Sequence, residues 1–344
     1  MKKTRMVVFL FAGLLAMPHF HSAAQAGDTL TRIKARDKVR CGVSDGVPGF
    51  SVKEPDGRWS GMDADFCRAL GAAVLGDAGK VEFIPLAAAA RFASLKAGEI
   101  DVLVRNTTWT LEREATLELL FAGVLYYDGQ SFLVPAKSDV HELSQLNGAS
   151  ICIVKGTTHE TNLADYFRAH NWSCKPIVVE TQGKAAEALF SGQCRAFTSE
   201  RPQLTAMKLK APKGPEEYLI LPDQISKEPL GPVVRRGDDE WFTVVRWVLF
   251  TLVRAEELGI TQSNVRARLE TETDPLVQRW LEADGIISKA LTVPPGWATR
   301  AVESVGNYAE MFERNFGSQS DLKLERGLNR LWTSGGLMYS PPVH

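Results

Sequence analysis

Short apolar runs alternate with amphipathic stretches in the chain that follows residue 26. The short runs have the length of buried strands, whereas the longer stretches repeat apolar residues at helical spacing. The predicted elements are strand Val39–Val43, a helix opened by Asp63 and Asp65, strand Val81–Ile84, helix Arg91–Ala97 and strand Ile100–Val104. This order of strands and helices predicts a mostly parallel sheet with helices on its faces.

The same pattern recurs from residue 150 onward. Its elements are strand Ser150–Val154, helix Thr158–His170, strand Pro176–Glu180, helix Lys184–Phe190 and strand Cys194–Thr198. Leu95 and Gly98 before a strand of the first copy are matched by Leu189 and Gly192 before a strand of the second. Two copies of one α/β unit predict two similar lobes with a ligand cleft between them, at the carboxyl ends of strands.

Two extended, proline-bearing segments connect the predicted lobes. Phe132–Pro135 leads into the second lobe and Glu228–Val234 leads out of it, which predicts a hinge. The chain returns to the first lobe through a helix at 238–258, capped by Asp238, and through further helices after about residue 275. We therefore expect a discontinuous lobe of residues 27–134 and 229–344 and a second lobe of residues 135–228.

The first 26 residues form a separate segment that is expected to be removed. Lys2, Lys3 and Arg5 precede an apolar run at Met6–Met17, and Ala24–Ala26 supplies the small residues of a cleavage site. Because the run is too short to span a bilayer, the segment predicts a secretory signal peptide, with an uncleaved anchor as the alternative. We expect a periplasmic protein whose mature chain does not insert into the membrane.

Composition adds few constraints to this picture. The chain has 344 residues, 44% hydrophobic and 24% charged, and a formal net charge of −1. These values are ordinary for a globular protein of about two domains and do not predict a nucleic-acid partner. Five cysteines in an exported chain allow disulfides, and the pairs Cys41–Cys67 and Cys152–Cys194 both fit the predicted elements, although sequence alone does not fix the connectivity.

Two motifs lie where predicted strands end and helices begin, at residues 106–113 and 156–160. Each offers hydroxyl groups and helix-start amides, which favour anions, and the first adds Arg113. A cation is disfavoured in the first turn of a helix, so Arg113 either grips a carboxylate or is a solvated surface residue. Thr157 and Glu160 match a capping box, and His159 between them is expected to be exposed.

Other side chains near the predicted cleft have two alternative roles. Glu200 follows the last strand of the second unit, where it either holds an ammonium group or pairs with Arg201. Trp109 and Phe50 either stack on a ligand or belong to the core. The histidines do not cluster, and the sequence contains no phosphate loop or nucleophile elbow, so we expect no metal, no cofactor and no catalytic residue.

Motifs spread over almost the whole mature chain carry a family resemblance. They are Arg40–Val43, Pro48–Phe50, Gly61–Arg68, Gly98–Asp101, Arg105–Thr110, Tyr126–Gln130, Leu146–Ala149, Asn162–Phe167, Ile225–Pro232 and Gly306–Tyr308. With them, the chain resembles the periplasmic solute-binding proteins of polar amino-acid ABC transporters (family 3), and more closely the general L-amino-acid-binding proteins. The resemblance implies an α/β, two-lobed periplasmic-binding-protein-like (type II) fold with mostly parallel sheets flanked by helices.

The resemblance also implies a function and a set of binding residues. Such proteins close on free L-amino acids, here over a broad range, and deliver them to an ABC permease without enzymatic activity; we expect a monomer. In this family an arginine at the position of Arg113 holds the α-carboxylate, and an acid at the position of Glu200 takes the ammonium group. Groups that assist lie at the positions of Asn106, Thr108, Thr157 and Thr158.

Several positions depart from the family pattern. Glu200 stands where aspartate is common, and its side chain is one methylene longer. The usual polar pair near Ser44 and Asp45 is altered, and both residues join Trp109 as further candidates for ligand binding. Arg105 either meets an acidic ligand side chain or braces the cleft. These departures predict a ligand choice or affinity that differs from that of a typical relative.

Two other functions remain as alternatives. Some periplasmic proteins of this fold are dehydratases of cyclic carboxylates such as prephenate or arogenate. If burial raised its pKa, Glu200 would serve as the general acid of such a reaction. A sensory protein that passes its ligand signal to a receptor is the remaining alternative.

Overall fold

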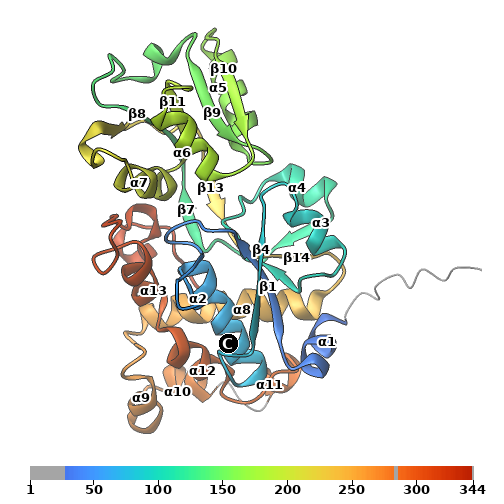
Figure 1. The fold of residues 1–344 in the computed structure, drawn as a ribbon. Helices are drawn as coiled ribbons and strands as arrows, with labels where there is room; N and C mark the ends of the chain where they lie inside the picture. The colour runs from blue at the N-terminus through green and yellow to red at the C-terminus, as the bar shows by residue number, and fades with distance from the viewer. Residues whose placement is uncertain (1–27, 283–285, 343–344) are drawn as a thin grey trace, which may run out of the picture.

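Two five-stranded sheets form the centres of two lobes in the computed structural model, which describes residues 28–282 and 286–342 (Figure 1). The predicted signal peptide lies outside the described residues. The first sheet has the order β4 (Val81–Leu86), β1 (Val39–Ser44), β5 (Val102–Leu103), β14 (Val233–Arg235) and β6 (Leu119–Phe121). The second has the order β10 (Lys175–Val179), β9 (Ser150–Val154), β11 (Ala196–Glu200), β8 (Gln130–Pro135) and β12 (Tyr218–Ile220).

The two sheets share one plan, as the repeat in the sequence predicted. In the first, β1 pairs in parallel with β4 and β5, and in the second, β9 pairs in parallel with β10 and β11. The fourth strand of each sheet runs antiparallel to its neighbour, with β14 beside β5 and β8 beside β11. Each of these fourth strands follows a crossing between the lobes, so each lobe is completed by the strand with which the chain enters or re-enters it.

Helices cover both sheets. Those of the first lobe are α1 (Thr29–Arg36), α2 (Met62–Leu75), α3 (Arg91–Lys96), α4 (Leu111–Thr116) and α8 (Asp239–Glu257). Those of the second lobe are α5 (His159–Ala169), α6 (Gln182–Phe190) and α7 (Arg201–Leu209). The carboxylate of Asp238 accepts a hydrogen bond from the Trp241 amide at 3.1 Å and caps α8, as predicted. The connections contain a short hairpin and several 3₁₀ turns. The hairpin is formed by β2 (Val52–Lys53) and β3 (Trp59–Ser60). The turns are η1 (Leu143–Leu146), η2 (Pro215–Glu217), η3 (Gly327–Asn329) and η4 (Trp332–Ser334).

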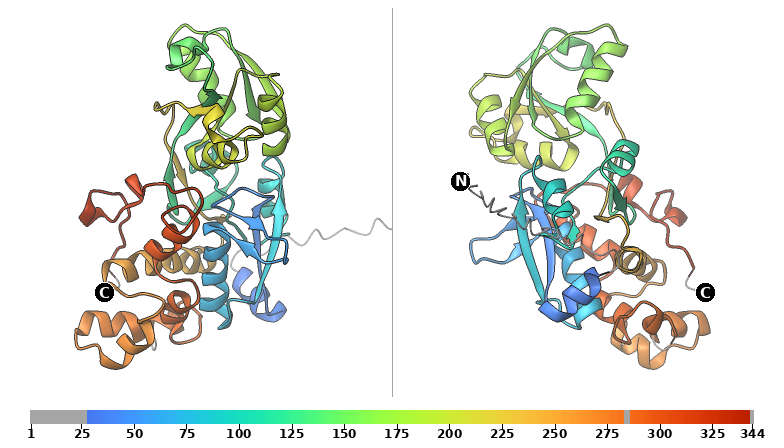
Figure 2. Two further views of the ribbon diagram at one scale, coloured as in Figure 1. Left: turned by 60° about the vertical axis from the view of Figure 1, so that its left-hand side comes forward. Right: turned by 90° about the vertical axis from the view of Figure 1, so that its right-hand side faces the viewer.

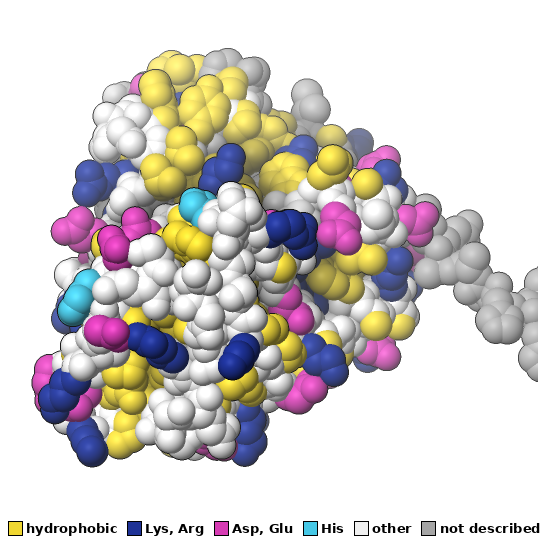
Figure 3. Space-filling model, turned by 90° about the horizontal axis from the view of Figure 1, so that it is seen from above, with side chains coloured by type: hydrophobic (Ala, Val, Ile, Leu, Met, Phe, Trp, Pro, Cys, Tyr) yellow, Lys and Arg dark blue, Asp and Glu magenta, His cyan; other side chains and the backbone are white. Residues whose placement is uncertain are grey.

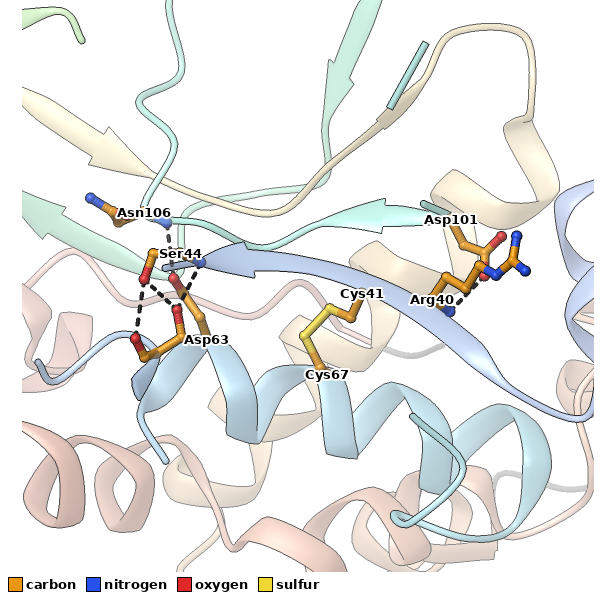
Figure 4. The surroundings of a disulfide bond; sticks show 8 residues. Arg40, Cys41, Ser44, Asp63, Cys67, Asp101 and Asn106 are labelled. Carbon is orange, nitrogen blue, oxygen red and sulfur yellow. Dashed lines mark hydrogen bonds between the residues drawn. A yellow bond between two sulfur atoms is a disulfide. The ribbon is translucent and has the colours of Figure 1, made fainter. Parts of the chain in front are cut away.

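Two disulfides tie strands to neighbouring segments. Cys41 of β1 is bonded to Cys67 of α2 with a Cα–Cα distance of 6.1 Å (Figure 4), and Cys152 of β9 is bonded to Cys194 at 5.7 Å. Both pairs are among those that the sequence allowed, and Cys174 is a free thiol. Cys194 was expected in a strand, but β11 begins two residues later because the Cys194 amide bonds the Ala188 carbonyl and closes the end of α6.

A two-stranded antiparallel ribbon of β7 (Tyr126–Asp128) and β13 (Glu228–Leu230) joins the lobes. The first crossing therefore precedes Phe132–Pro135, which was expected to form it. That segment is part of β8 instead, where Leu133 pairs with Phe197 of β11. Its apolar side chains explain the difference, because Phe132, Leu133 and Val134 are fully buried in the second lobe. The return crossing includes Glu228, the first residue of β13.

The C-terminal part of the chain adds helices to the first lobe (Figure 2). They are α9 (Val265–Thr271), α10 (Pro275–Glu282), α11 (Ile286–Ala290), α12 (Trp297–Val305) and α13 (Tyr308–Asn315). α12 packs on α2 and α8, and α13 packs on α8. Beyond α13 the chain reaches the hinge, where the Asn329 amide group bonds the main-chain N–H of Tyr127 at 2.7 Å and its carbonyl at 3.0 Å.

Over residues 28–282 and 286–342, no helix combines the length and apolar character needed to cross a bilayer. Seen from the end formed by the second lobe, Lys and Arg side chains and Asp and Glu side chains are scattered over the surface among hydrophobic and other groups (Figure 3).

Candidate functional site

A cavity lies between the carboxyl ends of the parallel strands of both sheets. The first lobe contributes Asp45 after β1, Arg91 after β4 and Asn106 after β5. The second lobe contributes Gln182 after β10 and Glu200 at the end of β11, together with residues that follow β9. Its volume is about 30 Å³, room for one or two water molecules. The position is the one at which open α/β sheets bind ligands.

Most of the candidate residues lie together at this cavity. Its lining includes Asp45, Arg105, Asn106, Thr108, Arg113, Thr157, Thr158 and Glu200. Ser44 and Trp109 are candidates that do not line it. The Ser44 hydroxyl is fully buried and bonds the hydroxyl and carbonyl of Ser51, and the Trp109 ring stacks on Phe121 with 5.7 Å between centroids. Both side chains serve the packing of the first lobe.

The backbone at the end of β5 turns sharply at Asn106, which has a positive φ of 36°. Its main-chain N–H donates to the Asp63 carboxylate at 2.9 Å, at the start of α2 (Figure 4). Asp63 is buried, and this burial raises its pKa to about 7 against the opposing effects of the Asn106 hydrogen bond and of Arg105. The turn directs the residues that follow, including Thr108, toward the cavity.

Arg113 is buried at the edge of the cavity and is not a solvated surface residue. The Thr110 hydroxyl accepts from the Arg113 amide and caps α4. The guanidinium donates to the Thr108 carbonyl at 2.7 Å and lies 5.2 Å from the centre of the Phe92 ring. Burial lowers the Arg113 pKa, while Glu228 and Glu200 oppose this effect. Among the described residues the other guanidinium N–H groups have no acceptor, so they could bind an anion.

Two further arginines lie beside Arg113. Arg91 is 3% exposed, donates to the Ala88 carbonyl at 2.8 Å and lies 4.5 Å from the centre of the Phe92 ring. Its Nε is buried without a hydrogen-bond partner among the described residues. Arg105 donates to the Leu86 carbonyl at 2.8 Å and approaches the Asp45 carboxylate only to 3.7 Å. Burial lowers the pKa of both arginines.

Over residues 28–282 and 286–342, two of these three guanidinium groups lack a carboxylate partner, and the third, that of Arg105, has only the Asp45 carboxylate at 3.7 Å. Within the described part of the chain, no carboxylate oxygen lies within 4.0 Å of Arg91 or Arg113. Buried cations without partners are costly, and an anionic ligand would compensate them. Sequence reasoning missed Arg91, which was assigned only to the start of a helix. Its position after a parallel strand of the first lobe is the signal that would have identified it.

His159 is buried, contrary to the prediction that it is exposed. Its side chain is 1% exposed, and its Nε2 lies 3.2 Å from the Glu200 carboxylate. Burial alone would lower the pKa of His159, but the Glu200 charge raises it above its usual value. Burial would raise the pKa of Glu200, but His159 and hydrogen bonds lower it. Glu200 therefore pairs with His159, not with its neighbour Arg201, and lines the cavity as a carboxylate.

The predicted capping box at Thr157 and Glu160 does not form. The Thr157 hydroxyl donates to the Val154 carbonyl at 2.7 Å and closes the turn after β9, and the start of α5 shows no side-chain cap bond. The Glu160 carboxylate accepts from the Gly156 amide at 2.7 Å, and Thr158 takes the N-cap position of α5. Both threonines nevertheless line the cavity.

Glu228 is a second residue that sequence reasoning assigned only to the hinge. It is 1% exposed, and its Oε2 accepts from the hydroxyls of Thr108 at 2.5 Å and Thr158 at 3.0 Å. Its Oε1 accepts from Asn162 at 2.6 Å and from Ser226 at 2.8 Å. One hinge carboxylate thus binds a threonine from each lobe. A buried acid in a proline-bearing crossing was the available signal.

The described residues do not include a group of three or more His, Cys, Asp or Glu side chains arranged to hold a metal ion. The cavity is lined by charged and hydroxyl groups, with three arginines on one side and the Glu200 carboxylate on the other, an arrangement that could hold a small zwitterion.

Similar proteins carry names that agree with this geometry. The putative amino-acid ABC transporter-binding protein YhdW of Escherichia coli K12 is 46% identical over 339 residues, 98% of this chain and 99% of that protein. The general L-amino acid-binding periplasmic protein AapJ of Rhizobium johnstonii is 45% identical over 324 residues, 94% of each chain. A solved periplasmic binding protein from Brucella ovis with glutathione bound has a TM-score of 0.89 at 45% identity, covering 92% of this chain and all of that one.

The family follows from a direct match as well as from these relatives. The model of the bacterial extracellular solute-binding proteins, family 3, matches residues 39–263, from β1 to the segment after α8. The two-lobed architecture and the cleft at the strand ends agree with this match. The chain belongs to the bacterial extracellular solute-binding proteins, family 3.

Proposed function

We propose that this protein captures free L-amino acids over a broad range in the periplasm and delivers them to the permease of an ABC transporter, without chemical change. The observation that carries this proposal is the buried Arg113 guanidinium, which lines the cavity. Among the residues that the structure describes, it has no carboxylate within 4.0 Å. An α-carboxylate would accept two parallel hydrogen bonds from it and supply the missing charge.

The opposite side of the cavity suits the ammonium group. The Glu200 carboxylate lines the cavity from the second lobe, and the hydroxyls of Thr108 and Thr158 lie at the junction of the lobes. Asn106, Thr157 and Asp45 complete the proposed set of ligand contacts. Because Arg91 and Arg105 leave further positive charge beside Arg113, acidic amino acids should be among the tighter ligands.

Binding would proceed by closure of the lobes about the β7–β13 ribbon. We place the lobe boundaries at about Gly129 and Glu228, where the sheets part; the first lies five residues before the residue 134 expected from the sequence. The cavity is lined by residues of both lobes, so a ligand would enter and leave as the lobes part. We expect the protein to act as a monomer.

The named relatives support transport over enzymatic activity. YhdW and AapJ are named as binding proteins, one of an ABC transporter and one for general L-amino acids. The Brucella ovis structure holds glutathione, an amino-acid derivative that belongs in any ligand panel. The dehydratase alternative also loses its physical basis, because a general acid at Glu200 needs a raised pKa, whereas its pairing with His159 lowers it.

The variant Arg113→Ala tests the site. We expect it to lose binding of every L-amino acid that the wild type binds, by on the order of 2–5 kcal/mol, because a buried carboxylate would lose its charged partner. Calorimetric titration of ligand-stripped protein measures this loss. Arg168→Ala is the matched control, since that arginine is 77% exposed on α5 and pairs only with Asp165. Unchanged affinity in Arg113→Ala would remove Arg113 from the site.

A further inference from the structure

A second hollow of about 180 Å³ adjoins the arginine-lined cavity. It lies between the loop after β1 in the first lobe and helices α6 and α7 in the second. The two share Val47, Gln182 and Gln203 as lining residues. The Gln182 amide donates to the Gln203 amide oxygen, so two of the shared lining residues form a side-chain pair where the two hollows adjoin. Side chains of this length change rotamer easily, and the pair is therefore movable.

The walls of the second hollow suit an extended ligand. They are apolar over much of their length, with Val47, Pro48, Ala186, Ala206 and Met207. Lys210 also lines the hollow, and within the described part of the chain its ammonium group has no carboxylate within 4.0 Å. Beyond this point the hollow continues, through Pro48, Ala206 and Lys210, into a larger groove that opens to the surface. A chain that leaves the first cavity thus passes apolar walls and meets a cation.

We propose that this hollow is a second subsite for amino acids extended through their side chains, namely short γ-glutamyl peptides with a terminal carboxylate. The inference rests on the proposed function, because it takes the α-carboxylate to be held at Arg113 and the α-ammonium at Glu200. An ordinary peptide bond would consume one of these two groups. A side-chain amide keeps both and directs the rest of the ligand past Gln182 and Gln203, toward Lys210.

Calorimetric titration with isomeric tripeptides tests the second subsite. The probes are γ-glutamyl-α-aminobutyryl-glycine, its α-linked isomer and free L-glutamate. The aminobutyryl residue replaces cysteine, so that no thiol reduces the Cys41–Cys67 and Cys152–Cys194 bonds. We expect the γ-linked peptide to bind within about tenfold of glutamate and the α-linked isomer to bind at least about a hundredfold more weakly.

Two variants assign the effect to the hollow. Ala186→Trp fills it from α6 and should weaken the γ-linked peptide by more than about tenfold while glutamate changes less than about twofold. Lys210→Gln should weaken only the γ-linked peptide, by about two- to fivefold, because the lysine is exposed. Ala169→Trp, at the exposed end of α5, is the control for adding a bulky side chain.

The outcomes separate this proposal from the proposed function. Glutamate binding with no binding of the γ-linked peptide, or equal binding of the two isomers, would overturn the second subsite and leave amino-acid capture standing. Equal loss of both ligands in Ala186→Trp would also overturn it. Binding of the γ-linked peptide without free amino acids would support the subsite and contradict capture of free amino acids. If neither binds, both proposals fail.

Discussion

At the scale of single residues, the cavity places buried positive side chains opposite a buried carboxylate. Arg91, Arg105 and Arg113 each give one hydrogen bond to a main-chain carbonyl and retain donors for a ligand. Opposite them, Glu200 is kept ionised by His159 at 3.2 Å. Burying these charged groups lowers the free energy of unfolding, and a bound ligand would restore part of it. Binding sites commonly reduce stability in this way.

We expect His159→Ala to lower the free energy of unfolding by about 3–5 kcal/mol at pH 6, because it leaves the buried Glu200 carboxylate without its cation. Denaturant titration at several pH values measures the change. His170→Ala, an exposed histidine at the end of α5, is the control and should change little.

The pH dependence of this effect follows from the two pKa shifts. The raised His159 pKa contributes stability that is complete below about pH 6.5 and is lost as pH rises through the folded-state pKa. The lowered Glu200 pKa contributes stability that is complete above about pH 4.5 and is lost as pH falls through its folded-state value. The difference between wild type and His159→Ala should be largest between these pH values, and a flat profile would contradict the ion pair.

The raised pKa of Asp63 should make the folded protein less stable as pH rises, which is opposite to the effect of Glu200. Its pKa of about 7 in the folded protein exceeds the value of 3.8 for a free aspartate, so the native state binds more protons than the unfolded chain between these values. Stability therefore falls as pH rises from about 4 to about 7, by up to about 4 kcal/mol. Asp63→Asn keeps an oxygen to accept from the Asn106 amide but cannot ionise, so its stability should not show this fall.

Denaturant titrations of wild type and Asp63→Asn at pH 4.5 and pH 7.5 check this prediction. The free energy of unfolding of the variant, relative to that of the wild type, should increase as pH rises. Parallel pH profiles would mean that Asp63 ionises in the folded protein as it does in water.

Residue types and positions predicted part of the site. Arg113, Thr108, Thr157, Thr158 and Glu200 meet at one cavity because each follows a parallel strand, which the alternation of elements already indicated. Arg91 and Glu228 were missed because their spacing alone looks structural, and His159 was misplaced because a histidine beside a helix start has no sequence signal for burial. Such contacts depend on the packing of one lobe against the other.

At the scale of elements, strands and helices of the two α/β units occur where apolar periodicity placed them, within one or two residues. The exception is the crossing, where Phe132–Pro135 was read as a connection from its proline. A terminal Pro135 is tolerated at the end of β8, so the residue did not mark the hinge. The ribbon β7–β13, only three residues in each strand, is too short for periodicity to reveal.

Gly231, which follows β13, should be intolerant of any side chain. A Cβ at this position would lie 1.9 Å from the Gly123 carbonyl oxygen, so the backbone would have to move. We expect Gly231→Ala to lower the free energy of unfolding by at least about 2 kcal/mol, measured by denaturant titration. Gly79→Ala is the control, because its Cβ would meet only the Asp77 side chain, at 3.1 Å. Wild-type stability in Gly231→Ala would mean that the two backbones are not packed this closely.

At the scale of the whole molecule, function depends on how the lobes meet. Each lobe contributes part of the cavity lining, and Glu228 on the hinge bonds a threonine from each lobe. The duplicated pattern in the sequence predicted two such lobes and a cleft. It did not predict that the segment after α13 contacts the hinge through Asn329, because that contact joins residues about two hundred positions apart.

The most direct test of the account is calorimetric titration of the mature protein from Gly27, unfolded and refolded to remove carried ligand, with each L-amino acid. The account predicts micromolar or tighter binding of several amino acids, acidic ones among them, each lost in Arg113→Ala. Absence of binding by every amino acid would contradict it and would mean that the arginine-lined cavity serves another class of anion.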